Sequence, residues 1–373
     1  MRPPESAGKL RAIDLFSGCG GLSCGLRGAG FEIVGGVDFD ASSLKTYREN
    51  FPQSRAVQAD LTNRDAADLL AEIGMKPGEL DLLAGGPPCQ GFSKNTPRRE
   101  RTSDDPRNLL MGAFLRYAEA WRPRFLLIEN VAEMRRGFEG AYTDLLTETL
   151  EAKNLGYHVA HYGVDASEYG LPQKRRRAFF LASRDNERLC LPEPTHGSRN
   201  AAKFSLRPPV TVWDALSDLP ILEHGAGTET CDYAADPQNE FQAWARQGSA
   251  VVYNHIAKKL QPTQAARLAS LLPGQGLKDL PDELRPKSGY SGAYGRLTKE
   301  MLAPTITRWV FHPGSGRFGH PVQCRVITIR EAARLQGFPD SFHFTGTYIQ
   351  QSHQIGNAVP PLLAEIIGRA FLF

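Results

Sequence analysis

The sequence predicts an α/β fold, a doubly wound and mainly parallel sheet, together with a second, smaller domain. Three observations support this prediction. The chain has 373 residues, more than one ordinary domain needs. Over the first 184 residues, short apolar runs alternate with helical patterns, as in consecutive βαβ units. From about Asp185 the alternation stops, and segments interrupted by proline and glycine follow.

The expected elements follow from these patterns in chain order. Strands are expected at residues 12–16, 31–37, 56–59, 80–84, 124–128, 157–162 and 177–182. Helices long enough to cover a sheet are expected at residues 41–50, 64–73, 109–121 and 142–153, and later at 329–336 and 360–373. We therefore expect one domain of residues 1–184, completed by 353–373, and a second domain of residues 185–352.

Composition excludes several classes of protein. Hydrophobic residues make up 41% and charged residues 23%, which is typical of a globular chain. No apolar run approaches the roughly 20 residues that cross a bilayer, and the first residues lack the apolar centre of a secretory signal. The six cysteines include no C-x-x-C pair, so neither a disulfide scaffold nor a zinc site is indicated. We expect a cytoplasmic protein without a metal or a membrane partner.

A glycine-rich turn follows the first expected strand, in the segment Ser17-Gly18-Cys19-Gly20-Gly21-Leu22. Glycines there allow a cofactor to approach the backbone, and the next helix begins with amides that attract negative charge. Ser23 stands where the dinucleotide fingerprint has its third glycine, which weakens a nicotinamide interpretation. Asp38 ends the second strand, where an acid can bind ribose hydroxyls. An adenosine-containing cofactor fits; a tight turn with a capping aspartate is the structural alternative.

Cys89 follows the fourth expected strand in the segment Gly85-Gly86-Pro87-Pro88-Cys89. The carboxyl ends of parallel strands are where doubly wound folds hold their ligands. A thiol there becomes a nucleophile when a cation or a helix N-terminus lowers its pKa. An isolated cysteine is more often a buried structural residue, but the constrained Gly-Gly-Pro-Pro path favours the nucleophile.

Further candidates lie after the next strands. Glu129 ends the fifth strand, where a partly protonated carboxyl can donate a proton to a heterocycle nitrogen; capping the next helix is the alternative. In the run 173–177, strand alternation directs Arg175 and Arg177 to the same side, where they can hold a base oxygen and phosphates. A second cationic stretch contains Lys94, Arg98 and Arg99, and a solvated loop face is its structural alternative.

Taken together and in this order, the motifs resemble those of the DNA (cytosine-5) methyltransferase family of the prokaryotic restriction-modification type. The motifs are Asp-Leu-Phe-Ser-Gly-x-Gly-Gly from Asp14, Pro-Pro-Cys-Gln-Gly-Phe-Ser from Pro87, Glu-Asn-Val from Glu129, Gln-Lys-Arg-Arg-Arg from Gln173, Arg-Leu-Thr from Arg296 with Pro-Thr-Ile-Thr from Pro304, Arg-Glu-Ala-Ala-Arg-Leu-Gln-Gly-Phe-Pro from Arg330 and Gln-Ile-Gly-Asn-Ala-Val-Pro-Pro from Gln354. They span nearly the whole chain.

The resemblance implies the S-adenosylmethionine-dependent methyltransferase fold, with S-adenosylmethionine as cofactor. Asp38 would bind the ribose, and Phe39 would stack on adenine where relatives often carry tryptophan. The remaining cofactor contacts implied are Phe16, Gly18, Cys19, Gly20, Gly21, Leu22, Asp60, Leu61, Leu109, Asn357 and Ala358.

The resemblance also implies a catalytic set. Cys89 would add to C6 of cytosine, Glu129 would support protonation at N3, and Arg177 would hold O2 with assistance from Arg175. No metal is required. Because the thiol must approach the face of the ring, the target cytosine must leave the duplex.

Double-stranded DNA is the implied partner, and the second domain would recognise its sequence. The implied DNA contacts are Gln90, Ser93, Lys94, Arg98, Arg99 and Thr305. A companion restriction endonuclease acting on the same site and a monomeric enzyme are further expectations of the resemblance.

Three alternatives stay open. A tRNA cytosine-5 methyltransferase shares the fold and nucleophile, although its usual Cys-Gln-Pro-Phe-Thr differs from the segment 89–93 here. A catalytically silent DNA-binding scaffold would not need Cys89, Glu129, Arg175 and Arg177 together. A nicotinamide dehydrogenase leaves Pro-Pro-Cys unexplained.

Overall fold

The computed structural model describes residues 8–88, 109–135, 141–152, 154–185, 189–197, 206–287 and 292–372. The chain forms two compact units. The first comprises Met1–Asp165, Arg176–Glu193 and Leu363–Phe373, and the second comprises Ala166–Arg175 and Pro194–Leu362. Compared with the expected boundaries, residues 166–175 and 353–362 lie in the second unit, and residues 185–193 lie in the first.

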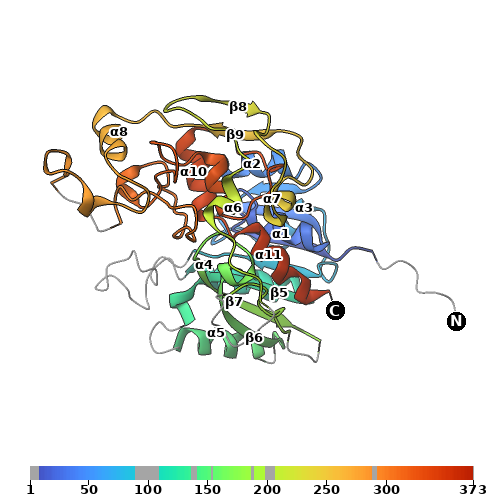
Figure 1. The fold of residues 1–373 in the computed structure, drawn as a ribbon. Helices are drawn as coiled ribbons and strands as arrows, with labels where there is room; N and C mark the ends of the chain where they lie inside the picture. Colours follow the sequence, from blue (N-terminus) through green and yellow to red (C-terminus); the bar gives the residue numbers. More distant parts are fainter. Residues whose placement is uncertain are drawn as a thin grey trace. The chain divides into compact units, whose positions relative to one another are not determined.

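The first unit contains a seven-stranded sheet of order β3-β2-β1-β4-β5-β7-β6 (Figure 1). The strands are β1 (Arg11–Leu15), β2 (Glu32–Asp38), β3 (Arg55–Gln58), β4 (Leu82–Gly85), β5 (Phe125–Val131), β6 (His158–Asp165) and β7 (Arg176–Ser183). Every pairing is parallel except those that β7 makes with β5 and β6. The predicted α/β class and mainly parallel sheet are confirmed.

Helices connect these strands and cover both faces of the sheet. They are α1 (Gly21–Ala29), α2 (Ala41–Asn50), α3 (Ala66–Ile73), α4 (Leu109–Trp121), α5 (Ala141–Glu151) and α11 (Pro361–Gly368), with the 3-10 turns Ala132–Arg135 and Arg369–Phe371. Alternation along β1 separates the faces: Ile13 packs in a core cluster with Trp121 of α4, whereas Asp14 contacts Ser23 of α1. The helices therefore wind on both sides, as the doubly wound prediction requires.

The C-terminal segment packs on the first elements of the chain. Figure 1 shows α11 in red beside α1 in blue, and a Cβ added at Gly368 would lie 3.0 Å from the Cβ of Ala29. The ring of Phe371 then contacts Phe31 and Phe125 edge-on, with centroids 6.5 and 5.5 Å away. The last residues thus complete the core of the first unit.

The second unit consists of short elements. They are the 3-10 turn Ala166–Tyr169, α6 (Val212–Leu216), the antiparallel strands β8 (Gly227–Cys231) and β9 (Val252–Ile256), α7 (Glu240–Ala245), α8 (Pro262–Ala269), the 3-10 turns Leu277–Asp279, Asp282–Leu284 and Pro313–Ser315, α9 (Ile329–Leu335) and α10 (Tyr348–Asn357). The predicted helix at residues 329–336 corresponds to α9.

Paired charges occupy the core of the second unit around α9. Arg334 is fully buried between Asp218 and Asp340, and Arg325 makes two hydrogen bonds of 2.7 Å to Glu331. Buried guanidinium groups are tolerated only when carboxylates or carbonyls satisfy them. Residues 330–339 therefore form a structural motif of this unit.

Candidate active site

The turn between β1 and α1 adopts a backbone that favours glycine. Phe16, Gly18 and Gly20 have φ angles of 58°, 54° and 98°. At Gly20 a Cβ would lie 2.5 Å from the ring of Phe51, whereas nothing lies within 4 Å of one at Gly18. Gly20 therefore permits close packing inside the protein, while Gly18 borders open space that a ligand can approach.

Asp38, at the end of β2, holds this turn. Its carboxylate accepts hydrogen bonds of 2.8 Å from the amides of Gly18 and Asp40, one on each oxygen. Burial raises the pKa of Asp38, while these amide bonds lower it. Asp38, the residue expected to bind the ribose, is thus hydrogen-bonded directly to the glycine turn.

The end of β3 lies beside the end of β2, because Asp38 pairs with Gln58 in the parallel register. The ring of Phe39 is 74% exposed, and its carbonyl accepts a hydrogen bond from Gln58. Asp60 is exposed, and hydrogen bonds from the Thr62 hydroxyl and amide lower its pKa. An uncovered aromatic ring and a carboxylate therefore occur at neighbouring strand ends.

Other expected cofactor residues differ in what they can offer. Leu22, Cys19 and Leu61 are buried, with exposures of 3%, 2% and 3%, so their side chains serve the core. The carbonyl of Leu61 accepts hydrogen bonds from α4, and Leu109 at the start of that helix is 64% exposed. The three buried residues, Leu22, Cys19 and Leu61, can therefore contact a ligand mainly through their backbone atoms.

Sequence reasoning did not single out Asp14 as a candidate. Its Oδ2 accepts hydrogen bonds from the amide and hydroxyl of Ser23, at 3.1 and 2.7 Å, and the Ser23 hydroxyl lies 3.2 Å from that of Tyr47. The Oδ1 atom is buried and has no partner among the described residues. Burial raises the pKa of Asp14 to about 7. The signal available in the sequence was an acid inside an otherwise apolar strand.

Asn130 connects the ends of two neighbouring strands. Its Nδ2 donates a 3.1 Å hydrogen bond to the carbonyl of Pro87, while its Oδ1 accepts from the amide of Val131. β4 and β5 are adjacent and parallel, as predicted. The buried amide of Asn130 therefore fixes the backbone two residues before Cys89.

Glu129 and Arg177 form an ion pair at the end of β5. Nε of Arg177 lies 2.9 Å from Oε1 of Glu129, and the two side chains are 16% and 11% exposed. In the antiparallel register Arg177 faces Val131, and Phe179 faces Glu129, so the arginine reaches diagonally across the strands. These two predicted catalytic residues are thus brought together.

Arg175 has a different environment from Arg177. It is 2% exposed within the second unit and donates to the carbonyls of Ile306, Gly356 and Ala358, at 3.2, 3.4 and 3.1 Å. It lies one residue before β7, which begins at Arg176, and the expected alternation of Arg175 with Arg177 stays a prediction. Its contacts are those of a residue that positions backbone.

Gln173 continues this network in the second unit. It donates to the Leu335 carbonyl and accepts from the Ile306 amide, and the Thr305 hydroxyl donates to the Lys174 carbonyl at 2.9 Å. Asn357 is exposed at the end of α10. Three motifs that are distant in the sequence therefore meet around two buried side chains, Gln173 and Arg175.

The comparisons with known proteins agree with this geometry. The model of the C-5 cytosine-specific DNA methylase family matches residues 10–372. The chain belongs to the C-5 cytosine-specific DNA methylase family.

Several relatives share nearly the full length of this family member. Type II methyltransferase M.AgeI of Thalassovita gelatinovora is 32% identical, over 95% of this chain and 97% of that protein. Type II methyltransferase M1.HphI of Haemophilus parahaemolyticus is 35% identical, over 97% of this chain and 87% of that protein. The crystal structure of a putative DNA modification methyltransferase encoded within an Escherichia coli prophage has a TM-score of 0.76 at 30% identity, covering 98% of this chain and 99% of that one. The predicted family and fold are confirmed.

Some predicted residues of this C-5 cytosine-specific DNA methylase lie outside the described residues. They are Cys89, Gln90, Ser93, Lys94, Arg98 and Arg99. Within the described ranges, no group of three or more His, Cys, Asp or Glu residues could hold a metal ion, and no helix is long and apolar enough to cross a membrane.

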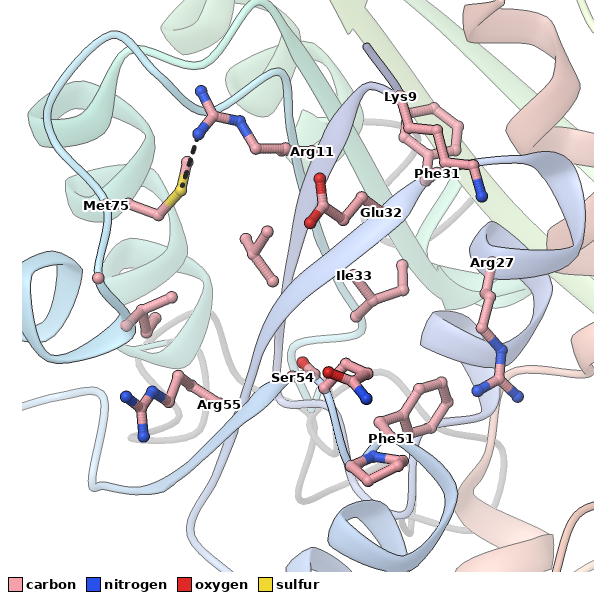
Figure 2. Close-up of a pocket in the computed structure, with 15 residues that line it drawn as sticks. Lys9, Arg11, Arg27, Phe31, Glu32, Ile33, Phe51, Ser54, Arg55 and Met75 are labelled. Carbon is pink, nitrogen blue, oxygen red and sulfur yellow. Dashed lines mark hydrogen bonds between the residues drawn. The ribbon is translucent and has the colours of Figure 1, made fainter.

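A cavity of about 510 Å³ in this methylase lies at the amino ends of the strands β1, β2 and β3 (Figure 2). Its lining includes Arg11, Glu32 and Arg55, which begin β1, β2 and β3. Figure 2 shows Arg11 bonded to the sulfur of Met75. Because the cofactor candidates lie at the carboxyl ends of the strands, this cavity is separate from the candidate active site.

Proposed function

We propose that the chain is a DNA cytosine-5 methyltransferase and the modification enzyme of a restriction-modification system. It would transfer a methyl group to C5 of a flipped-out cytosine in a short duplex sequence. The observation that carries the proposal is the arrangement at the ends of β4 and β5. There the Glu129–Arg177 pair lies next to Asn130, which holds the backbone before Cys89.

S-adenosylmethionine is the proposed methyl donor, and the described residues fit it. Asp38 and Asp60 supply carboxylates for the ribose and the adenine edge, and the uncovered ring of Phe39 supplies a stacking surface. Gly18 leaves open space beside the turn. When bound, the cofactor supplies an electrophilic methyl group on a sulfonium.

Cytosine C5 is too weak a nucleophile for direct methylation, so this chain's residues must activate the ring. In the proposed reaction the Cys89 thiolate forms a bond to C6, and a proton supported by Glu129 goes to N3, which makes C5 enamine-like. The methyl group would go to C5 and leave the cofactor's sulfur as a neutral thioether. A base would then remove the C5 proton, the S–C6 bond would break, and the N3 proton would return to Glu129. Cys89 is thereby regenerated.

Arg177 has two tasks in this proposal. Its Nε holds Glu129 in place, its Nη1 donates to the Arg176 carbonyl, and its Nη2 can donate to the cytosine O2. Arg175 donates to three carbonyls and is assigned a positioning role in place of the base contact first expected. Thr305 is proposed to contact the target phosphate.

The second unit is proposed to recognise the DNA sequence. This recognition role stays a prediction. The same holds for a cytoplasmic location, a monomeric state and a companion endonuclease. The proposed phosphate contacts by Lys94, Arg98 and Arg99 stay predictions as well, and each predicts a salt-dependent loss of DNA affinity on substitution.

The test is transfer of tritiated methyl from S-adenosylmethionine to mixed-sequence duplex DNA, with tRNA in parallel and bisulfite sequencing of labelled DNA. We expect label at one short DNA motif and none in tRNA. Label in tRNA alone would favour the tRNA enzyme, and label in neither would favour the silent scaffold.

A second measurement addresses the nucleophile. A duplex with 5-fluorocytosine at the target cannot release its C5 substituent as a proton, so it should trap a covalent complex visible on a denaturing gel. Cys89→Ala should abolish the complex and the methyl transfer while sparing DNA binding. Turnover retained by this variant would remove Cys89 from the mechanism.

A further inference from the structure

An exposed aromatic and cationic surface lies on the second unit, directly after Thr305. Arg308 is exposed, and the Trp309 ring is 44% exposed with the Arg308 guanidinium 5.5 Å from its centroid. Within the described part of the chain, neither Arg308 nor Lys258 forms an ion pair with a carboxylate. The surface thus combines positive charge without a carboxylate partner and a half-exposed indole ring.

Two aromatic side chains pack against the ring of Trp309. Its ring lies 5.1 Å from that of His353 and 5.7 Å from that of Phe311, which is only 6% exposed. The Lys258 ammonium lies 4.2 Å from the centroid of Phe311, and burial lowers the pKa of Lys258. Neighbouring rings therefore support Trp309, and one cation lies over its ring and another over the ring of Phe311.

The backbone that carries Arg308 and Trp309 is held at several points. The Ser352 hydroxyl donates to the Arg308 carbonyl at 2.9 Å, and Ile306 is bonded to Gln173 and Arg175. At Gly356 a Cβ would lie 2.1 Å from the Arg308 amide nitrogen, so α10 touches the backbone directly. Such a fixed segment loses little conformational freedom when it binds a partner.

We propose that Arg308, Trp309 and Lys258 form a DNA-docking surface, in which the cations bind backbone phosphates and Trp309 packs on a base unstacked by the flipping of its neighbour. The inference rests on the proposed function and adds a contact that recognises deformed duplex. Charge identifies the partner as a polyanion, and the half-exposed indole fits the face of an unstacked base. A paired, undistorted duplex offers Trp309 no such face.

The two kinds of contact predict different losses, measured by fluorescence anisotropy on a duplex with the methylated motif and one without it. Arg308→Ala should weaken binding to both duplexes and reduce the slope of log K against log salt by about 1. Trp309→Ala should weaken binding only to the motif duplex, by about tenfold, with an unchanged slope, because base stacking is worth about 1–3 kcal/mol. Trp309→Phe should retain most of the affinity.

Two exposed residues of the same unit serve as controls. Arg207 is bonded to Glu240, so Arg207→Ala should leave the slope unchanged, and Ile221 is 79% exposed, so Ile221→Ala should leave both affinities unchanged. Thermal unfolding of each variant checks folding.

A third readout follows the unstacked base itself. With 2-aminopurine beside the target cytosine, wild type should quench the fluorescence that flipping releases, and Trp309→Ala should not. If the wild type methylates DNA but Arg308→Ala and Trp309→Ala both bind DNA and quench the fluorescence like the wild type, the proposed docking surface is wrong. The proposed function is then unaffected. If wild type methylates only tRNA, both proposals fall.

Discussion

Asn130 donates a buried hydrogen bond to the carbonyl of Pro87, 43 residues earlier in the chain, and so ties the end of β5 to the loop that leads to Cys89. A single amide side chain therefore holds the backbone two residues before Cys89, the proposed nucleophile. In the proposed reaction, this contact helps to set the geometry together with the proposed catalytic side chains.

Asn130→Ala should lower kcat by about tenfold while leaving the Kd for S-adenosylmethionine unchanged. The substitution leaves the Pro87 carbonyl without its partner, which costs about 1–3 kcal/mol and loosens the loop. Single-turnover methylation and equilibrium dialysis measure the two quantities. Asn154→Ala is the matched control, because Asn154 bonds Glu119 at the surface. An unchanged kcat would show that Pro87 is held by other contacts.

The Glu129–Arg177 pair should be strongly coupled in a double-mutant cycle of unfolding free energies, by more than about 1 kcal/mol. Both side chains are largely buried, so removing one leaves the other's charge unpaired. The exposed Arg64–Glu72 pair provides the comparison and should give less than about 1 kcal/mol. Arg177→Lys should retain much of the stability but little methyl transfer. Equal coupling in both cycles would contradict this assignment.

Phe39→Ala should raise the Kd for S-adenosylmethionine by about tenfold, and Phe39→Trp should lower it. The ring is exposed beside Asp38, and a larger aromatic surface increases stacking. Equilibrium dialysis in the absence of DNA measures the constant. Ile221→Ala, another exposed apolar residue, should change nothing. A Kd insensitive to all three substitutions would separate Phe39 from the cofactor site.

Asp14 should make stability depend on pH. Burial raises its pKa from 3.8 to about 7 in the folded protein, so folding favours the protonated form. Its contribution is fully present below pH 3.8 and is lost as the pH rises toward and through 7, a change of about 4 kcal/mol.

Urea unfolding of wild type and Asp14→Asn between pH 4 and pH 8 checks this prediction. The free energy of unfolding of the wild type, relative to the variant, should fall as the pH rises. Parallel curves for the two proteins would show that Asp14 does not titrate in this range.

Gly356→Ala should destabilise the protein and weaken DNA binding, although alanine ordinarily stabilises a helix relative to glycine by about 1 kcal/mol. The added Cβ would lie 2.1 Å from the amide nitrogen of Arg308 and must displace that segment. Gly112→Ala in α4 is the control, because nothing lies within 4 Å of its Cβ, and it should be stabilising. If both substitutions stabilise the protein, the backbone segment at Arg308 can move aside without a cost in stability.

The sheet was predictable from sequence because its strands are short apolar runs separated by helices with apolar faces. β4, for example, is buried at every residue. In contrast, β8 is largely exposed and lacks an apolar pattern, so nothing in its sequence indicated a strand.

Part of the site was equally predictable. Glu129 and Arg177 lie on adjacent strands, β5 and β7, and the antiparallel pairing of these strands brings them together. Arg175 was not predictable, because its carbonyl partners lie 131 to 183 residues away and an arginine run suggests a solvated surface. Asp14 was missed because burial, which raises its pKa, depends on packing by α1 and α2.

The division of the chain has a consequence for protein engineering. The backbone passes between the two units four times, at residues 165/166, 175/176, 193/194 and 362/363. A chimera that exchanges only residues 194–362 would combine the host's Gln173 and Arg175 with foreign carbonyls at positions 306, 335 and 356. Transplanting the ten-residue segment Ala166–Arg175 together with the larger piece keeps these partners matched. Exchanging the second unit between relatives therefore requires a graft of two fragments.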